Sequence, residues 1–416
     1  MPNIDNLCEK YNSPHRLHIE TTKKCNMKCE HCYVSSDNTY AHHDLNALKK
    51  VIFRSGSKGA KRITLTGGEF LTRNDWKDIV SYSIKCGFRN VYFITNGLNL
   101  KKGTLEWLSR TQSIHNVKNS LKIIIKKDRP LTIGFGISLD GIDGYGKIRK
   151  NNAGKSIDVD KILKTIELAT NYGLYVTVNT TVSNSIIAKE LYAMYETLLA
   201  LKIDRWQIDQ VFPERRGGSS SAIGPYDNWF PVALESYYKI VRNYLSTYPK
   251  KTKMMLEIVQ LFRTAILTSG FGSERTNLVH PCDYQFGSVI VENGSLVRFC
   301  PSLRGIQDNI FDIEDVEIEK ESFTRNASFS KFSELTINDL ACNDCRYRFI
   351  SHGGCRANSF SLEGSIYKKD PICCRLSPFI EDKIVPLLPE KIIAEFISLI
   401  DENGTVPNCS RFPIKN

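Results

Sequence analysis

Three cysteines lie close together near the start of the chain, in the segment CNMKCEHCY at residues 25–33. Three residues separate Cys25 from Cys29, and two separate Cys29 from Cys32. Zinc in a structural site usually takes four protein ligands, and a ferredoxin-type segment carries a fourth cysteine nearby. Here the next cysteine is Cys86, in a segment with a helical pattern. Three thiolates on a four-iron cluster would leave one iron free to bind another molecule.

A second polar motif, Gly67-Gly68-Glu69, ends a β-rich run. Its glycines permit a close approach of backbone segments, and the Glu69 carboxylate could hold an ammonium group. Two further runs end in the same manner, at Asn96-Gly97 and at Asp140-Gly141. Taken singly, each of these motifs is also explained by a tight turn. Their common position, at or just after a strand end, favours one shared site.

The first half of the chain alternates β-rich runs with helical patterns. The predicted strands cover residues 16–22, 62–69, 90–97, 131–141, 175–183 and 205–212. Apolar residues at three- and four-residue steps predict helices at 73–86, 158–172 and 185–201. Such alternation predicts parallel β/α units, with a site at the carboxyl ends of the strands, where the polar motifs stand. Six strands rather than eight would leave a barrel open on one side.

Composition narrows the setting. A chain of 416 residues, 41% of them hydrophobic, can bury a full core in two or three structural units. It has no apolar run long enough for a membrane span and no signal peptide pattern, so we expect a cytoplasmic protein. Thirteen cysteines in that compartment favour metal ligands or catalytic groups over disulfides. The net charge of +11 lacks a dense basic run with aromatics, so neither nucleic acid nor membrane is an expected partner.

The order of these motifs resembles that of the radical S-adenosylmethionine (radical SAM) enzymes. The resemblance covers roughly residues 16–215 and is carried by the three cysteines, Gly67-Gly68-Glu69, TNG at 95–97 and SLDG at 138–141. It implies a partial (β/α)6 barrel of the TIM type in an α/β fold. Cys25, Cys29 and Cys32 would hold a [4Fe–4S] cluster whose open iron binds SAM. Reduction would cleave SAM and give a 5′-deoxyadenosyl radical that abstracts a substrate hydrogen.

The resemblance also implies which side chains meet SAM. Gly67, Gly68 and Glu69 would bind the methionine amine, and Ser138 and Arg149 would bind the carboxylate. Taken alone, Arg149 favours the interpretation as a solvated charge, and its order relative to the other motifs favours a role in SAM binding.

Three further positions follow from the same resemblance. Asn179 and Thr180 would lie near the ribose of SAM. Tyr33 and His31 flank the last cysteine of the cluster motif, where the backbone meets the adenine. His31 stands where an aromatic residue is more usual.

The C-terminal part resembles a SPASM domain, the extension that carries one or two auxiliary iron–sulfur clusters in radical SAM enzymes acting on peptides. GGCRA at 353–357 matches its pattern, and Ser351 stands where a ligand cysteine is usual. The implied ligands of a first cluster are Cys282, Cys300 and Cys355. Those of a second are Cys342, Cys345 and either Cys373 or Cys374. Ser351, His352 or the spare cysteine could complete one cluster, an iron could stay open, and a zinc site is the alternative.

The predicted organisation has five parts. They are an N-terminal segment at 1–15, the barrel at 16–215, a helical bridging region at 216–275, the SPASM-like domain at 276–385, and a C-terminal helix and tail at 386–416. The bridging region is expected to hold helices around 227–248 and 253–268. Arg215 and Arg216 precede it, and we expect them to face solvent rather than substrate. Cys8, Cys86 and Cys409 are expected to be free thiols.

The function implied is a maturase of a ribosomally synthesised peptide (RiPP) or of a protein, forming a thioether or C–C crosslink or oxidising a side chain. Pro301 after Cys300 counts against sulfatase maturation, which needs an acidic residue there. The alternatives are a radical SAM enzyme on a small molecule in cofactor or antibiotic biosynthesis, a peptide epimerase, and a non-catalytic iron–sulfur or zinc protein. A flavodoxin or ferredoxin would donate electrons, and the leader peptide would be bound by a separate protein or recognised directly by the enzyme.

Overall fold

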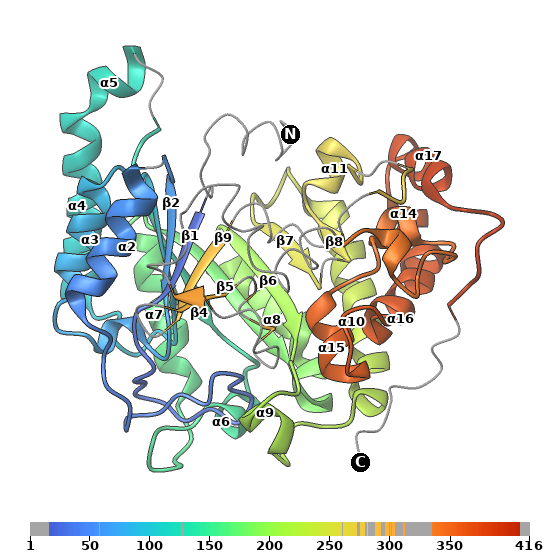
Figure 1. Ribbon diagram of the computed structural model, residues 1–416, viewed down its shortest axis with the longest axis horizontal. Helices are drawn as coiled ribbons and strands as arrows, with labels where there is room; N and C mark the ends of the chain where they lie inside the picture. The colour runs from blue at the N-terminus through green and yellow to red at the C-terminus, as the bar shows by residue number, and fades with distance from the viewer. Residues whose placement is uncertain are drawn as a thin grey trace.

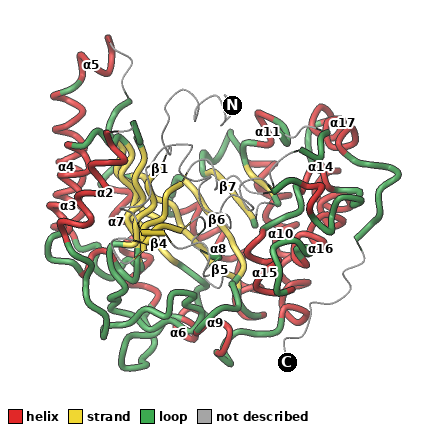
Figure 2. The backbone as a smooth tube through the Cα atoms, in the orientation of Figure 1, coloured by secondary structure: helices red, strands yellow, loops and turns green. Residues whose placement is uncertain are grey.

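A computed structural model describes residues 16–57, 59–125, 129–259, 261–272, 275–278, 281, 288–292, 296–298, 300, 302–303, 311–312 and 335–407. Its centre is a sheet in the order β11-β10-β9-β1-β2-β3-β4-β5-β6-β7-β8. Helices from the first half of the chain flank one side, and helices from the C-terminal part lie at the other end (Figure 1). Figure 2 shows the strands side by side between these two groups of helices.

The middle of the sheet consists of six strands in chain order, each parallel to the next. They are β1 (Arg16–Glu20), β2 (Arg62–Thr66), β3 (Asn90–Thr95), β4 (Thr132–Ser138), β5 (Tyr175–Val182) and β6 (Arg205–Gln210). This arrangement confirms the predicted α/β fold and its six parallel strands. Because the carboxyl ends of parallel strands share one edge, the loops that follow them meet there.

Helices cover one face of these strands. They are α2 (Leu45–Ser57), α3 (Trp76–Lys85), α4 (Lys102–Lys118), α7 (Val159–Asn171), α8 (Ser185–Ala200) and α10 (Tyr226–Thr247), with the short α5 (Ser120–Ile125) after α4. Alternate strand residues such as Ile133, Phe135 and Ile137 are fully buried beneath them. The side chains of Asp158 and Asn184 cap α7 and α8 by accepting from first-turn amides. The core therefore lies between the sheet and this helical layer.

Both ends of the six-strand row are extended. β7 (Met255–Ile258) pairs in parallel with β6, and β8 (Phe262–Arg263) pairs antiparallel with β7. At the other end β9 (Ser288–Glu292) lies parallel to β1, followed by β10 (Leu296–Arg298) and β11 (Phe311–Asp312). The chain from 276 onward thus contributes strands as well as cysteines.

The predicted helix at 253–268 is wrong. That segment holds β7, β8 and the short α11 (Ile266–Ser269). Leu256 and Ile258 are buried, whereas the side chain of Met255 is 40% exposed. Burial that alternates along the chain in this way is typical of a strand. As a strand, this short apolar run pairs with the backbone groups at the edge of β6. If the run were a helix, those backbone groups would lack a partner.

The C-terminal part is a compact set of short helices. It comprises η4 (Ile337–Asp339), α14 (Arg348–Ser351), α15 (Arg356–Glu363), α16 (Pro371–Phe379), η5 (Ile380–Ile384), η6 (Val385–Leu387) and α17 (Glu390–Leu399). Arg375 of α16 pairs with Asp227 of α10 at 2.7 Å. Ser361 of α15 donates to Glu214, in the connection after β6, at 2.5 Å. These contacts join the C-terminal helices to the barrel.

Four connections between strands and helices carry the features discussed below. Residues 21–43, here called the cysteine loop, join β1 to α2. η1 (Phe70–Thr72) follows β2, and α6 (Tyr145–Ile148) follows β4. The short helix α9 (Arg216–Ser219) follows β6. Within the described ranges, no helix combines the length and apolar character that crossing a membrane requires.

Candidate iron–sulfur and SAM site

The three clustered thiols of the cysteine loop lie close to one another. Cys25 and Cys29 are buried, and Cys32 is partly buried. Burial raises the pKa of Cys25, and the charges of Glu69 and the other two cysteines raise it further. Burial likewise raises the pKa of Cys29, with Arg149 opposing the shift and Cys32 reinforcing it. Each thiolate therefore disfavours the next, and a bound cationic group would relieve that repulsion.

This donor set suits an iron–sulfur cluster. Among the residues that the structure describes, no three Cys, His, Asp or Glu side chains converge on a point where a single metal ion would bind. A four-iron cluster does not require that convergence, because each thiolate binds a different iron. The apolar side chains of Met27, Leu98 and Ile157 pack with the thiols and limit access of water. The residues present fit a cluster held by three thiolates.

Arg73 closes the base of the cysteine loop. Its buried guanidinium donates from Nη1 to the carbonyl oxygens of Thr21 and His43, at 2.8 and 2.9 Å, near the two ends of the loop. The carboxylate of Asp75 accepts two more bonds from the same group, each 2.7 Å long. A planar guanidinium can make all four bonds at once. The loop is therefore pinned where it leaves and re-enters the barrel.

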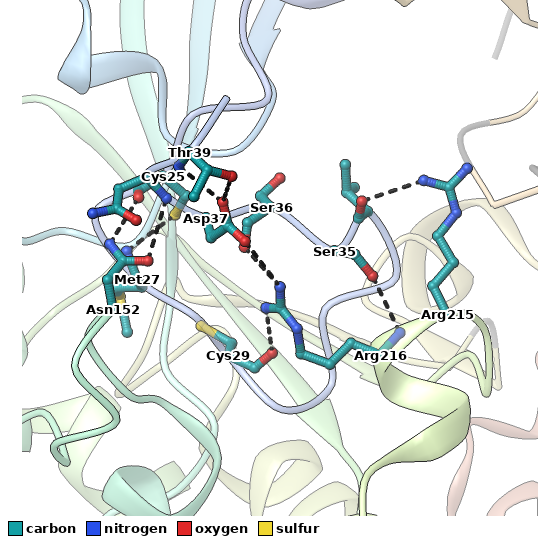
Figure 3. A network of polar contacts seen from close by, with 12 residues as sticks. Cys25, Met27, Cys29, Ser35, Ser36, Asp37, Thr39, Asn152, Arg215 and Arg216 are labelled. Carbon is teal, nitrogen blue, oxygen red and sulfur yellow. Dashed lines mark hydrogen bonds and ion pairs between the residues drawn. The ribbon is translucent and has the colours of Figure 1, made fainter. Parts of the chain in front are cut away.

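Arg216 of α9 holds the middle of the same loop (Figure 3). Its Nη1 and Nη2 atoms donate to the carbonyl oxygens of Cys29 and Ser36, both at 3.1 Å. Its backbone amide donates to Ser35 Oγ at 3.2 Å. The prediction that this residue faces solvent is wrong, because only 16% of its side chain is exposed. Arg215, by contrast, is exposed as expected.

The glycines of the Gly-Gly-Glu motif allow the end of β2 to touch the cysteine loop. A Cβ atom on Gly67 would lie 2.1 Å from the carbonyl oxygen of Thr22, and φ at Gly67 is +140°. A Cβ atom on Gly68 would lie 2.4 Å from the carbonyl oxygen of Lys24. The amides of Gly68 and Glu69 donate to these same two carbonyl groups, at 2.7 and 2.9 Å. Glycine is therefore required by close approach rather than by a turn alone.

Glu69 links the ends of β2 and β3. Its buried carboxylate accepts from the Leu71 amide at 3.0 Å, from Thr95 Oγ1 at 3.0 Å and from the Asn96 amide at 2.8 Å. Burial raises its pKa, which these bonds oppose. Asn96 in turn donates to Asn26 Oδ1 at 2.7 Å, beside Cys25. The Gly-Gly-Glu and TNG motifs thus both meet the cysteine loop.

Arg149 lies beside the thiols instead of in solvent. It donates from Nε to Asp140 Oδ2 at 2.6 Å and from Nη1 to Cys29 Sγ at 3.7 Å. Burial alone would raise the pKa of Asp140, but the Arg149 charge, with His31 and the Thr181 amide, brings it below its ordinary value. Burial lowers the pKa of His31 to about 4, so its ring is neutral near pH 7. This buried set borders the cysteine loop.

Ser138 and Asn179 stand on neighbouring strands. They are partners in the register of β4 and β5, and both are partly buried. The Asn179 side chain points toward β4, because its Nδ2 atom lies 2.5 Å from where Gly136 would carry a Cβ atom. Thr180 belongs to the other face of β5, where it donates to the Leu139 carbonyl at 2.7 Å. Tyr33 lies partly buried in the cysteine loop.

A second group of thiols lies in the C-terminal part. Cys342, Cys345 and Cys373 are close enough that the first two raise the pKa of the third, after burial and Asp370. Of the adjacent pair 373–374, the described contacts therefore bring Cys373 to this group, while Cys374 is buried in α16. The hydroxyl of Ser351 accepts from the Gly353 amide at 3.3 Å.

Asp370 organises the neighbourhood of this second group. Its buried carboxylate accepts from the Cys355 amide at 2.7 Å, from the Ile372 amide at 2.9 Å and from the Cys373 amide at 3.3 Å. It caps α16 and joins the starts of α15 and α16. Cys355 and Cys373 are thereby held at two neighbouring helix ends.

Two other cysteines lie within the described residues. Cys300 and Cys86 are partly buried, and burial raises the pKa of Cys86. The predictions for Cys282, Cys8 and Cys409, and that for Pro301, fall outside the described residues. The described cysteines form no disulfide.

Sequence reasoning missed three residues that build the site, Arg73, Arg216 and Asp370. Arg73 and Arg216 belong to no recognisable spacing, because their backbone partners lie at least 30 positions away in the chain. Asp370 instead accepts from amides within 15 positions, as the cap of α16. The pair Gly217-Gly218 directly after Arg216 was a usable indication. A Cβ atom on Gly217 would lie 3.2 Å from the carbonyl oxygen of His31, so α9 needs glycine to approach the loop.

Comparison with families of known proteins agrees with this geometry. Residues 19–198 match the family model described as the Radical SAM superfamily. Over 186 residues the chain is 27% identical to the antilisterial bacteriocin subtilosin biosynthesis protein AlbA of Bacillus subtilis, covering 44% of this chain and 36% of that protein. Over 381 residues it is 23% identical to the AdoMet-dependent heme synthase of Methanosarcina barkeri, covering 87% of this chain and 97% of that protein.

Solved structures with the same fold cover most of the chain. The structure of anSMEcpe with bound AdoMet superposes with a TM-score of 0.66 at 16% identity, covering 92% of this chain and 99% of that one. The structure of Streptococcus suis SuiB bound to S-adenosylmethionine gives a TM-score of 0.60 at 15% identity, covering 88% and 80%. At these identities the likeness is one of fold.

Proposed function

We propose that this protein, whose residues 19–198 form a radical SAM domain, binds a [4Fe–4S] cluster through Cys25, Cys29 and Cys32 and modifies a side chain of a peptide or protein. The observation that carries the proposal is the gathering of three thiols in one buried loop, bordered by the Gly-Gly-Glu motif and by Arg149. When bound and reduced, such a cluster supplies the electron that cleaves SAM to a 5′-deoxyadenosyl radical. SAM would contact Gly67, Gly68, Glu69, Ser138, Asn179 and Tyr33.

The side chains of the protein prepare this site in three ways. Met27, Leu98 and Ile157 keep water away from the thiols. Glu69 holds the end of β2 against that of β3, so the carboxylate is already oriented when an ammonium group arrives. Arg149 donates to Cys29 and balances the negative charge that three thiolates bring into the barrel. In this proposal Arg149 supports the cluster before it serves SAM.

Support for a peptide substrate comes from the relatives. The subtilosin biosynthesis protein matches the barrel region in sequence, and SuiB with the same fold is known in complex with its precursor peptide SuiA. The structure of anSMEcpe is likewise known with bound peptide. We propose a crosslink or side-chain oxidation, in which auxiliary clusters held by Cys300, Cys342, Cys345, Cys355, Cys373, Cys374 and Cys282 accept the second electron. The proposed surroundings are the cytoplasm, a flavodoxin or ferredoxin donor and a separate leader-binding protein.

A small-molecule substrate is the second candidate. The match to the heme synthase extends over 87% of this chain, well beyond the barrel, whereas the match to the subtilosin protein covers 44%. A long match of this kind favours a shared C-terminal arrangement, although the identity is low. The two candidates share the same radical chemistry and differ in what occupies the barrel opening.

The test is release of 5′-deoxyadenosine. The protein is reconstituted anaerobically with iron and sulfide and given SAM and dithionite, alone and with peptides encoded beside its gene. Product from the wild type and from C86A, but not from the C25A/C29A/C32A variant, supports the proposal. A cluster-loaded wild type that neither binds SAM nor releases product contradicts it. A mass change in a neighbouring peptide favours the maturase, and turnover of a tetrapyrrole without any peptide change favours the second candidate.

A further inference from the structure

We infer that Arg216 is a positioning residue for the cluster: from the connection after β6, it fixes the cysteine loop in the shape that brings the three thiols together. The inference rests on the proposed function for the identity of the bound group. The contacts that carry it are those of the protein chain alone. They join two segments that are 187 positions apart in sequence.

The cysteine loop depends on outside partners because it has little regular structure of its own. Within the described residues 21–43 there are isolated bridges and turns but no helix or strand. Its internal backbone bonds are scattered: the Cys25 amide donates to the Asp37 carbonyl at 2.7 Å, and the Ser35 amide donates to the Cys32 carbonyl at 3.1 Å. The amides of Cys32 and His43 donate to the carbonyl groups of Cys29 and Thr21, at 3.3 and 3.4 Å. Buried carbonyl groups in such a segment need donors from elsewhere.

Arg216 supplies those donors at two points of the loop simultaneously. One guanidinium bridges the carbonyl groups of Cys29 and Ser36, and it lies 4.0 Å from the carboxylate of Asp37 (Figure 3). Because the backbone carbonyl of Asp37 accepts from the Cys25 amide, the arginine holds the part of the loop that carries Cys29 against the part that anchors Cys25. The spacing of the first two thiols is thereby set before iron binds.

The rest of the α9 segment reinforces this contact. Arg215 has a φ angle of +51° and donates to the Val34 carbonyl at 3.3 Å. Ser220 donates to the carboxylate of Glu30 at 2.7 Å. The same carboxylate pairs with Lys150 at 2.8 Å. A non-glycine residue with positive φ is costly and persists where the surrounding contacts require it. The segment is therefore built to lie against the loop.

Arginine is required here because of its geometry. Two terminal nitrogens in one rigid plane reach two carbonyl groups, whereas the single ammonium of lysine cannot hold both in the same arrangement. Bonds from a charged donor are also stronger than neutral ones. We therefore expect R216K to lose most of the effect although it keeps the charge.

The test compares R216K and R216Q with R110Q, a matched change of an arginine whose side chain is 74% exposed on α4. Hydrogen exchange is measured on the metal-free proteins, with the amides of β5 as an internal reference for global folding. We expect the amides of Cys25 and Ser35 to exchange roughly tenfold faster in both Arg216 variants, with β5 and R110Q unchanged. Loop exchange equal to that of the wild type would overturn the inference.

A second readout follows iron in the reconstituted proteins. The time course of iron loss to a chelator, followed by the cluster absorbance, is expected to be several-fold faster in R216K and R216Q than in R110Q. If the wild type takes up no cluster, the proposed function fails and the inference falls with it. If the wild type binds a cluster and both Arg216 variants retain it equally long, the proposed function stands and only the inference is overturned.

Discussion

Arg149 and Asp140 form a buried ion pair at 2.6 Å, and the same guanidinium donates to the sulfur of Cys29. Asn96 of the TNG motif donates to the sulfur of Cys25 at 3.9 Å. The expected role of Arg149 toward the SAM carboxylate is therefore combined with a role toward the protein itself. Its charge is shared between a carboxylate at the end of β4 and a thiol of the proposed cluster.

Removing Arg149 should destabilise the protein strongly. R149M leaves Asp140 buried without its cation, and a broken buried pair costs about 3–5 kcal/mol. The double variant D140N/R149M is expected to lose less than R149M alone, because the orphaned charge is gone. Urea unfolding of the metal-free proteins measures both. An R149M protein as stable as the wild type would contradict the prediction.

A methyl group on Gly68 should displace the cysteine loop. In G68A the new Cβ atom would meet the carbonyl oxygens of Lys24 and Lys23, at 2.4 and 2.7 Å, and backbone cannot yield as a side chain can. We expect a loss of about 2 kcal/mol or more, together with reduced iron uptake. The control is G103A in α4, where nothing lies within 4 Å of the new atom and a gain of about 0.5–1 kcal/mol is expected. Thermal unfolding of both variants and measurement of their iron content test this prediction.

The Arg73–Asp75 ion pair should stabilise the ends of the cysteine loop less at acidic pH. The hydrogen bonds from Arg73 lower the pKa of Asp75 below its ordinary value of 3.8, against the effect of burial. A carboxylate with a lowered pKa stabilises the fold fully above its unfolded pKa, and that contribution is lost as the pH falls through the folded pKa. The stability difference between wild type and D75N should therefore be constant from about pH 7 to about pH 5 and shrink below about pH 4. Urea unfolding across this range measures it, and a difference that grows on acidification would be inconsistent with the pairing.

Asp370 should govern the C-terminal cysteines without affecting the first three. In D370N one amide nitrogen would face the backbone N–H donors of Cys355 or of Ile372, which leaves a buried group unsatisfied. Introduced into the C25A/C29A/C32A background, D370N is expected to remove most of the remaining iron. The exposed D382N change is the control. Equal iron content in the D370N and D382N proteins would show that Asp370 does not support cluster binding.

Much of the fold could be predicted because its determinants are local. Each parallel strand is a short β-rich run that ends at a polar or glycine turn, and the observed ends differ from the predicted ones by a few residues. β7 was missed because four residues of strand pattern are too short to recognise without the edge of β6 beside them. Its structure is set by a partner and not by its own sequence.

The candidate site divides in the same way. Cys25, Cys29 and Cys32 are candidate ligands because of their spacing along the chain, so sequence is enough to propose them. Arg216 acts on carbonyl groups, which every residue has, and its partners lie 180–187 positions earlier. No periodicity links such positions. Contacts of that kind emerge only from the assembled barrel.

The distance between Arg216 and Cys29 also sets an order of events during synthesis. The cysteines leave the ribosome early, while the arginine that holds their loop is made after six strands have been translated. Because chains fold from the N-terminus as they are made, the cysteine loop lacks its contact with Arg216 until about half of the protein has been synthesised. A nascent chain interrupted before α9 would carry every cysteine of the motif and still lack its closed loop. If the loop holds the proposed cluster, its insertion is expected to follow completion of the barrel.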